Sequence, residues 1–344
     1  MTTAVGWFNN KGGVGKTTLS CNLAAILSRT HDVKLLYVDC DPQCNATQLL
    51  LDDSHWTDIF GNRRESIGRT LLKSLRHIRA GDSSVDTQIP TIRSRRFKLD
   101  VLPGHPSLSV IEDRLSASWV DFKAGDLGAA RRSLWMRNLV DSVDYDLVFF
   151  DMGPSLGALN RTVLLGCDTF VTPMAADLFS LYALDNIYEW MRGWIGDYER
   201  GIDELKRGFP EALEEYNLPL HPAVTNGYAG YTVQQYVSRS SGSEIRHVRA
   251  YEQYKARIPM RVKPLMSWAL TASMQPNLGL VPNMFSMVPL AQAAHAPIVD
   301  LQSSDGLRGA QVSQNHKYAL QLEGIAARLA ENLGMRDHQG TLDA

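Results

Sequence analysis

Length, composition and charge already exclude several function classes for this chain. With 344 residues, of which 44% are hydrophobic, the chain can bury a substantial core as one large domain or two smaller ones. Its formal net charge of −2 excludes attraction to nucleic acid by the protein as a whole, so any such binding must come from local basic patches. No apolar run approaches the roughly 20 residues that a helix needs to cross a bilayer.

The first predicted strand, Ala4 to Phe8, leads into a glycine-rich loop and then a predicted helix beginning at Leu19. Small residues in such a loop let backbone N–H groups converge on phosphate oxygens, and the helix N-terminus adds the positive end of its dipole. In this setting Lys16 is predicted to reach the β- and γ-phosphates, and the Thr17 hydroxyl to ligate Mg²⁺. The predicted nucleotide-binding residues of the loop are Gly12, Gly13, Val14, Gly15, Lys16, Thr17 and Thr18.

The loop departs from the general phosphate-loop pattern at its front. Asn10 occupies the position of the first glycine, and a second lysine, Lys11, follows it. A plain glycine-rich turn is the alternative, but the position of the loop between an apolar run and an amphipathic helix favours phosphate binding. The residues on the apolar face of that helix are Leu19, Leu23, Ile26 and Leu27.

Two later predicted strands end in carboxylates. The runs Val33 to Val38 and Leu147 to Phe150 are followed directly by Asp39 and Asp151. A lone aspartate after a strand is usually a turn or a helix cap, but open α/β sheets bind ligands at the carboxyl ends of their parallel strands. Three such segments in this order indicate one nucleotide site.

The fold class follows from the apolar runs. These runs, including Phe170 to Thr172, are short and continuous rather than alternating, which suits a parallel sheet covered on both faces. We predict an α/β fold, a mostly parallel twisted sheet flanked by helices, with inserted helical segments. We expect a single domain over residues 1–344, with insertions around 52–98 and 227–277.

These motifs resemble the ParA/MinD family of deviant Walker A P-loop ATPases, and ParA more than MinD. The matching segments are spread over most of the chain and cover residues 11–18, 39–47, 99–109, 146–160 and 280–298. The resemblance implies an ATP-dependent sandwich dimer in which Lys11 crosses to the phosphates of the partner.

The resemblance also implies roles for single residues, with ATP and Mg²⁺ as cofactors. Asp39 and Asp151 would support Mg²⁺ through water, together with Thr17. Asp41 would position or activate the attacking water, so the catalytic set is Lys11, Lys16 and Asp41. These roles agree with phosphoryl transfer, which needs mainly charge neutralisation and in-line placement of a nucleophile.

The adenine contacts are assigned from order along the chain. Asn226, ending a predicted strand at Pro222 to Thr225, and Pro282, following Leu278 to Val281, fall where the family contacts adenine. Two positions depart from the family pattern: Gly153 stands where ParA-like proteins commonly carry proline, and Cys44 replaces a usual glycine. We expect these departures to alter switch mobility.

A basic stretch lies within the second expected insertion. Its arginines and lysines are opposed only by Glu244 and Glu252, and Tyr251 and Tyr254 lie among them. Such a patch can neutralise backbone phosphates without reading sequence, although charge runs are usually solvated faces. The resemblance favours DNA binding here, because ParA proteins use basic residues in their C-terminal half. The candidates are Arg246, Arg249, Lys255, Arg257, Arg261 and Lys263, and a second basic stretch covers residues 63–98.

The remaining features concern the termini and the cysteines. Tyr318, Leu322, Ile325, Leu329 and Leu333 form a helical stripe, which predicts a last helix packed on the sheet rather than a basic membrane helix. About ten residues precede the loop, too few for a helix-turn-helix. Four scattered cysteines and no secretory leader predict free thiols in a reducing cytoplasm, with nucleoid association if DNA binding holds.

The leading hypothesis is a ParA-like partition or positioning ATPase. It forms an ATP-dependent homodimer, coats DNA non-specifically and hydrolyses ATP when a ParB-like or other cargo adaptor protein stimulates it, with no membrane partner. The alternative is a nucleotide-controlled regulatory or defence-associated interaction protein that uses the second insertion as a docking surface. A metabolic P-loop kinase or ligase is a third interpretation, disfavoured because no second substrate pocket is recognisable.

Overall fold

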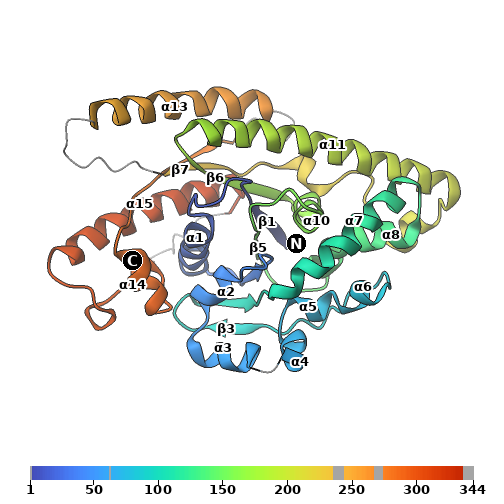
Figure 1. Cartoon of the computed structure of the whole chain (residues 1–344), viewed down its shortest axis with the longest axis horizontal. Coiled ribbons are helices and arrows are strands. Elements are labelled where there is room, and N and C mark those ends of the chain that lie inside the picture. The colour runs from blue at the N-terminus through green and yellow to red at the C-terminus, as the bar shows by residue number, and fades with distance from the viewer. Residues whose placement is uncertain (1, 62, 235–243, 267–273, 336–344) are drawn as a thin grey trace, which may run out of the picture.

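The computed structural model describes residues 2–61, 63–234, 244–266 and 274–335. Within these residues the strands form one eight-stranded sheet in the order β3-β4-β2-β5-β1-β6-β7-β8. Neighbouring strands are parallel except for β3 and β4 (Figure 1). The strands are β1 (Thr3–Trp7), β2 (Leu35–Asp39), β3 (Ile92–Ser94), β4 (Leu99–Leu102), β5 (Leu147–Asp151), β6 (Thr169–Ala175), β7 (Gly230–Gln234) and β8 (Asn277–Val281).

Helices cover both faces of this sheet (Figure 1). The helices of at least five residues are α1 (Lys16–Thr30), α2 (Asn45–Leu50), α3 (Asp53–Phe60), α6 (Arg76–Ala80), α7 (Ser109–Lys123), α8 (Leu127–Ser133), α9 (Trp135–Asp141), α10 (Ala158–Gly166), α11 (Leu178–Gly208), α13 (Glu244–Leu265), α14 (Met287–Ala293) and α15 (Ala310–Asn332). Single turns of helix are α4 (Arg63–Ser66), α5 (Leu71–Ser74) and α12 (Ala212–Glu215).

Alternate residues of the central strands enter two separate cores. Leu36 and Val38 of β2 pack with α7, α9, α10 and α11, whereas Leu35 and Tyr37 pack with α1, α2, α14 and α15. All five residues of β2 are buried, as are all five of β5. The prediction of a parallel sheet covered on both faces is therefore confirmed, because a strand buried on both sides needs apolar residues at every position.

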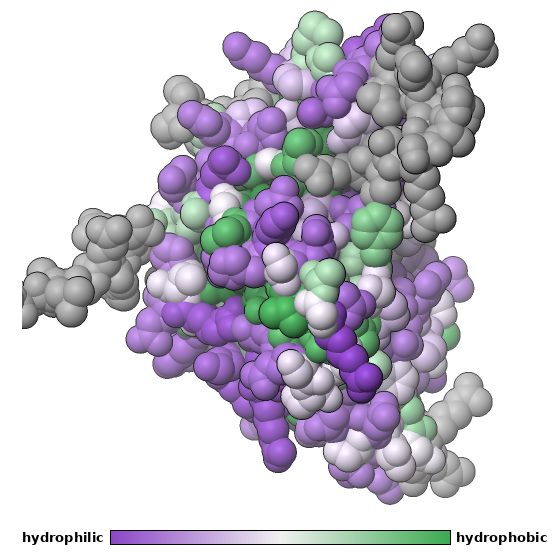
Figure 2. Space-filling model, turned by 90° about the vertical axis from the view of Figure 1, so that its left-hand side faces the viewer, coloured by the Kyte–Doolittle hydropathy of each residue, from purple (hydrophilic) through white to green (hydrophobic). Residues whose placement is uncertain are grey.

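The last helix, α15, packs against the sheet as predicted. Tyr318, Leu322, Ile325 and Leu329 are all at most 5% exposed and belong to the same core as α1. No helix in the described part of the chain is long and apolar enough to cross a membrane. The face shown in Figure 2 is largely hydrophilic, with hydrophobic residues gathered in small patches.

One predicted strand is wrong. Residues 222–225 belong to no strand: Ala223–Asn226 form a single 3-10 turn, and the next strand, β7, begins only at Gly230. The short run starts with a proline, which lacks an N–H donor for a sheet, and Thr225 instead bonds back to the Pro222 carbonyl at 2.8 Å. The expected insertion at 227–277 therefore contains a strand of the central sheet as well as α13.

Candidate functional site

The glycine-rich loop joins β1 to α1 at the carboxyl edge of the sheet. Gly13 and Gly15 have φ angles of 74° and 70°, a backbone conformation that glycine adopts without strain. Gly15 directly precedes the first turn of α1, so the N-terminus of the helix opens onto the loop. The conformation of the loop and its place before a helix are those of an anion-binding site.

Asp151 meets two residues of the loop at the end of β5. Lys16 Nζ donates to Asp151 Oδ1 at 3.2 Å, and Thr17 Oγ1 donates to Asp151 Oδ2 at 2.7 Å. Burial raises the pKa of Asp151, although Lys16 and Thr17 act in the opposite direction. The lysine and the hydroxyl are thus held in place by a carboxylate that is itself fully buried.

Asp39 lies beside Asp151, because β2 and β5 pair in a register that places the two residues opposite each other. Thr47 donates to Asp39 Oδ2 through its backbone N–H at 2.8 Å and through its hydroxyl at 2.6 Å. Burial, followed by the charge of Asp151, raises the pKa of Asp39 to about 7. Two adjacent buried carboxylates repel each other, so the pair favours a proton or a cation nearby.

Asp41 begins the turn between β2 and α2 and lines the pocket described below. Its Oδ1 accepts from the Gln43 N–H at 2.9 Å. A Cβ on Gly153 would lie 3.3 Å from Asp41 Oδ1, so glycine at this position leaves room for the carboxylate. Cys44 has a φ of 55°, so this cysteine adopts the left-handed backbone conformation that favours glycine.

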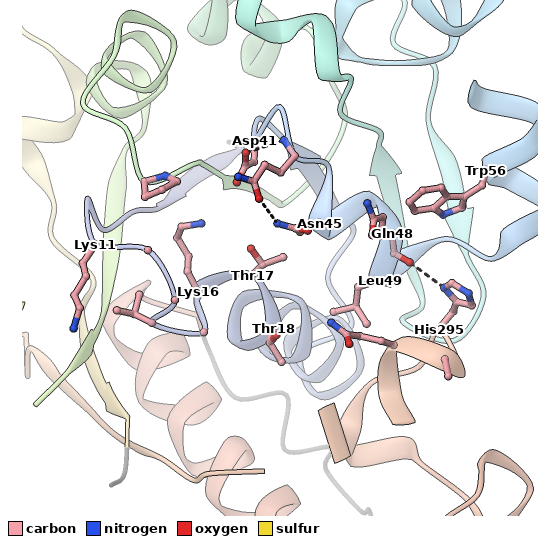
Figure 3. A pocket seen from close by; sticks show the side chains of 18 of the residues that line it. Lys11, Lys16, Thr17, Thr18, Asp41, Asn45, Gln48, Leu49, Trp56 and His295 are labelled. Atoms are coloured by element: carbon pink, nitrogen blue, oxygen red, sulfur yellow. Dashed lines mark hydrogen bonds between the residues drawn. The ribbon is translucent and has the colours of Figure 1, made fainter. Parts of the chain in front are cut away.

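Lys11 turns away from the loop that carries it. Figure 3 shows its side chain pointing out of the pocket, opposite in direction to Lys16. Its ammonium group forms an ion pair with Asp177, the residue that caps α11 by accepting from the Ser180 N–H. Partial burial raises the pKa of Asp177, but the bonds from Lys11 and Ser180 outweigh that effect and the pKa is lowered.

A pocket of about 950 Å³ extends from this loop toward α3 and the end of α14 (Figure 3). Residues 11–18 line one end of it. Gln48, Trp56, Gln292 and His295 line the other end, where His295 Nδ1 lies 3.0 Å from the Gln48 carbonyl oxygen. The volume and the change from charged to aromatic and amide groups suit a ligand with a phosphate end and a flat polar end.

The two predicted adenine contacts do not line this pocket. Asn226 precedes β7, next to Gly227, whose backbone lies against Asp168 and Thr169 at the start of β6. It is therefore at the opposite edge of the parallel sheet from the phosphate loop, and the reason for assigning it to adenine is lost. Pro282 does follow a strand, β8, at the same edge as the loop, but it is buried and is not among the residues that line the pocket.

The basic stretch forms helix α13, which lies along α11 (Figure 1). Lys255 pairs with Glu252 at 3.4 Å and Arg261 with Asp185 at 3.1 Å, whereas Arg257 and Lys263 are exposed. The side chains of Arg246 and Arg249 lie outside the described residues. In the other basic stretch, ion pairs join Arg76 to Asp86, Arg93 to Asp100 and Arg96 to Asp305.

A metal at this site would meet oxygen donors. Thr17 Oγ1 and the carboxylates of Asp39 and Asp151 are hard oxygen ligands of the kind that Mg²⁺ prefers. No three His, Cys, Asp or Glu side chains converge as a metal site in the described ranges. The oxygen donors present would suit an ion that Thr17 holds directly and the two carboxylates support through water.

Sequence reasoning missed several residues that the fold brings to the site. Asp177, in the loop after β6, and Gln234, the last residue of β7, lie beside the phosphate loop. Trp56 and His295 reach the pocket from distant segments. Gln234 could have been predicted from its position at the carboxyl end of a parallel strand, had the limits of β7 been known. Nothing local in the sequence identifies Trp56 or His295.

Comparison with known proteins gives a consistent assignment. The AAA_31 family model, described as an AAA domain, matches residues 2–199. The chain is 28% identical to the cell division protein PomZ of Myxococcus xanthus over 58% of its own length and 54% of PomZ, so it spans about half of that relative.

Two further matches cover more of each chain. The chain is 29% identical to the chromosome partitioning protein ParA of Caulobacter vibrioides over 74% of its own length and 79% of ParA. The crystal structure of protein DIP2308 from Corynebacterium diphtheriae superposes with a TM-score of 0.76 at 33% identity, covering 96% of this chain and 98% of that one. Because the family model covers more than half of the chain, the chain belongs to the AAA_31 family, the ParA/MinD type of P-loop ATPase.

Proposed function

We propose that this protein is a partition or positioning ATPase that switches between an ATP-bound dimer and a monomer. The observation that carries the proposal is the division of labour between the two loop lysines. Lys16 is buried against Asp151 inside its own site, whereas Lys11 is at the rim and points outward. A lysine at the rim can reach the phosphates of a second molecule once it leaves its ion pair with Asp177.

Nucleotide binding rests on the loop, with ATP and Mg²⁺ as the cofactors. The N–H groups of residues 12–18 would hold the phosphates, and Lys16 would neutralise the β- and γ-phosphates. Mg²⁺, when bound beside Thr17, supplies positive charge to the same phosphate oxygens. Asp151 orients both Lys16 and Thr17, and Asp39 shares the buried negative charge that a cation would offset.

Hydrolysis is assigned to Asp41. Its carboxylate lines the pocket near the loop and is only 6% exposed, so it can hold a water molecule in line with a γ-phosphate while bulk water is kept out. Gly153 leaves the space that this carboxylate occupies. Removing Asp41 should therefore slow the chemical step and leave the ATP-bound dimer in place.

The dimer should bind duplex DNA without sequence preference, and a cargo adaptor should stimulate release. Exposed Arg257 and Lys263 on α13 support this part, while the ion pairs of Lys255 and Arg261 reduce the free charge of the helix. Arg246 and Arg249 complete the proposed contact set. The relative named a chromosome partitioning protein is in keeping with such a role.

The test is binding of the Asp41→Ala protein to random-sequence duplex DNA, measured by fluorescence anisotropy at two salt concentrations with ATP–Mg²⁺ or ADP. We expect binding only with ATP, weakened by salt as phosphate contacts require. A double variant, Arg257→Glu with Lys263→Glu, should lose DNA binding but keep ATP turnover. An ATP-bound dimer seen by light scattering that binds no DNA would contradict the DNA-binding part.

A second candidate is a nucleotide-controlled protein-docking switch. It is favoured by exposed apolar side chains on α13 and on its neighbour α11. Tyr182 and Trp190 of α11 are 55% and 48% exposed, and Met260 of α13 is 67% exposed. Such groups bind proteins better than phosphates. If the variant with Arg257→Glu and Lys263→Glu keeps the function of the protein in the cell and the Trp190→Ala variant loses it, the protein acts by docking to another protein.

A further inference from the structure

The phosphate loop is tied to the end of strand β7 by one side chain. Gln234 Nε2 donates to the backbone oxygen of Val14 at 3.2 Å. A Cβ on Gly15 would collide with the same Nε2 atom, so the amide packs directly against the loop. Gln234 is the last residue of β7 and pairs with Ala175 of β6, which fixes its backbone beside the loop.

The atom that Gln234 contacts belongs to the peptide unit that also carries the Gly15 N–H. In a planar trans peptide the C=O and N–H bonds point in opposite directions. The bond from Gln234 holds the Val14 oxygen on one side of the peptide and therefore directs the Gly15 N–H to the opposite side. Val14 and Gly15 both line the pocket. An anion accepting from that N–H polarises the peptide and strengthens the bond from Gln234.

Gln234 also contacts helix α13 through its backbone. The hydroxyl of Tyr251 donates to the Gln234 carbonyl oxygen at 3.1 Å. The Tyr251 ring is partly buried against the core, and the ammonium of Lys255 lies 5.7 Å from the ring centroid. Two hydrogen bonds thus connect the phosphate loop to a basic helix that is far from it in sequence.

Helix α13 has a weak point that makes this contact important. Pro259 lies inside the helix, and a proline there has no N–H to bond the carbonyl four residues earlier. Beyond it, Val262 is fully buried, and Ile258 next to the break is 1% exposed. The C-terminal half is therefore held by packing, and before the break the Tyr251 hydroxyl ties the helix to the end of β7.

We propose that Gln234 and Tyr251 couple occupancy of the phosphate loop to the order of the N-terminal half of α13. Bound phosphate strengthens the Val14–Gln234 bond, holds Gln234 in place and keeps the acceptor for Tyr251 aligned. An empty loop loosens this contact, and the helix opens more often before Pro259. The coupling rests on the nucleotide binding proposed above, but not on whether α13 binds DNA or protein.

Hydrogen exchange with and without ADP–Mg²⁺ tests the coupling. ADP is used because its β-phosphate reaches the loop without the γ-phosphate that dimerisation needs. In the unmodified protein, ADP should slow exchange in residues 250–258 about two- to fivefold, the equivalent of part of one net hydrogen bond. Tyr251→Phe keeps the ring and removes the donor, so the slowing should disappear.

Tyr254→Phe is the matched control, because Tyr254 is on the same helix and its ring packs against the same core. This variant should keep the response to ADP. Gln234→Ala should lose the response and also bind ADP about fivefold more weakly, since it removes the bond that orients the Gly15 peptide. Thermal unfolding of each variant separates these effects from loss of fold.

The reciprocity of the coupling between the nucleotide site and α13 gives a further test. A purely structural role of Tyr251 would not pass it. Coupling between two sites is equal in both directions. The factor by which Tyr251→Phe weakens ADP binding, measured by calorimetry, should therefore match the factor by which ADP slows exchange in α13. Unequal factors would contradict the coupling.

The remaining outcomes are distinct. If ADP binds but exchange in α13 stays unchanged, or if Tyr251→Phe responds as the unmodified protein does, the coupling is wrong and the nucleotide site stands. If calorimetry finds no ADP binding, the nucleotide function itself is wrong and the coupling is overturned with it.

Discussion

Asp39 offers the sharpest test of the electrostatics of the site. The carboxylate is fully buried at the end of β2, and burial together with the charge of Asp151 raises its pKa from 3.8 to about 7. Replacing Asp39 by asparagine removes the charge and keeps an oxygen for Thr47. In the unmodified protein the Asp41 N–H donates to Asp39 Oδ1 at 3.2 Å. In the variant this N–H faces the amide nitrogen instead, so the lost hydrogen bond lowers stability by an amount that does not depend on pH.

The sign and size of the effect follow from the two pKa values. Because the folded state holds the proton more tightly than the unfolded chain, the stability of the protein falls as pH rises between about 4 and about 7. A shift of about three units corresponds to at most about 4 kcal/mol, since each unit is about 1.4 kcal/mol. The asparagine variant does not lose stability in this way, because its side chain carries no titrating proton. Its stability relative to the unmodified protein should therefore rise by about 2 kcal/mol or more from pH 5 to pH 8.

Urea unfolding without nucleotide, in the presence of a chelator, measures this difference at about pH 5 and about pH 8. Asp113→Asn, which changes an exposed carboxylate on α7, is the control and should show a nearly constant difference. The same asparagine variant at position 39 should bind ADP less tightly when Mg²⁺ is present. If the difference in stability between the Asp39→Asn variant and the unmodified protein is the same at both pH values, the raised pKa of Asp39 is refuted.

Three further predictions test the loop and the core. Lys16→Ala should abolish ADP binding in calorimetry, because the phosphates lose their main cation; retained binding would remove Lys16 from the site. Lys11→Ala should keep ADP affinity but give no ATP-dependent dimer in light scattering, and a normal dimer would contradict its role toward a second molecule. Ile325→Ala on α15 should lower the free energy of unfolding by about 2–5 kcal/mol in urea, since the side chain is 1% exposed; a loss under about 1 kcal/mol would contradict its packing.

The sequence by itself determined the parts of the site that depend on local pattern. A glycine-rich stretch between an apolar run and an amphipathic helix predicts a strand-to-helix turn, and the structure has this turn there, although α1 begins at Lys16 rather than at Leu19. Asp39 and Asp151 follow continuous apolar strands, and parallel strands bring their carboxyl ends to one edge of the sheet. The apolar stripe of α15 likewise needs only the helical period to be recognised.

Only the tertiary structure decided which distant side chains meet. The ion pair of Lys11 with Asp177 and the bond of Gln234 to Val14 join residues more than 160 positions apart, and no local period or spacing encodes such contacts. The strand expected at 222–225 was wrong for a related reason: the limits of a short run containing proline depend on which neighbouring strand is available to pair with it. The free charge of α13 was also undetermined, because Asp185, which neutralises Arg261, reaches it from α11 through packing of the two helices.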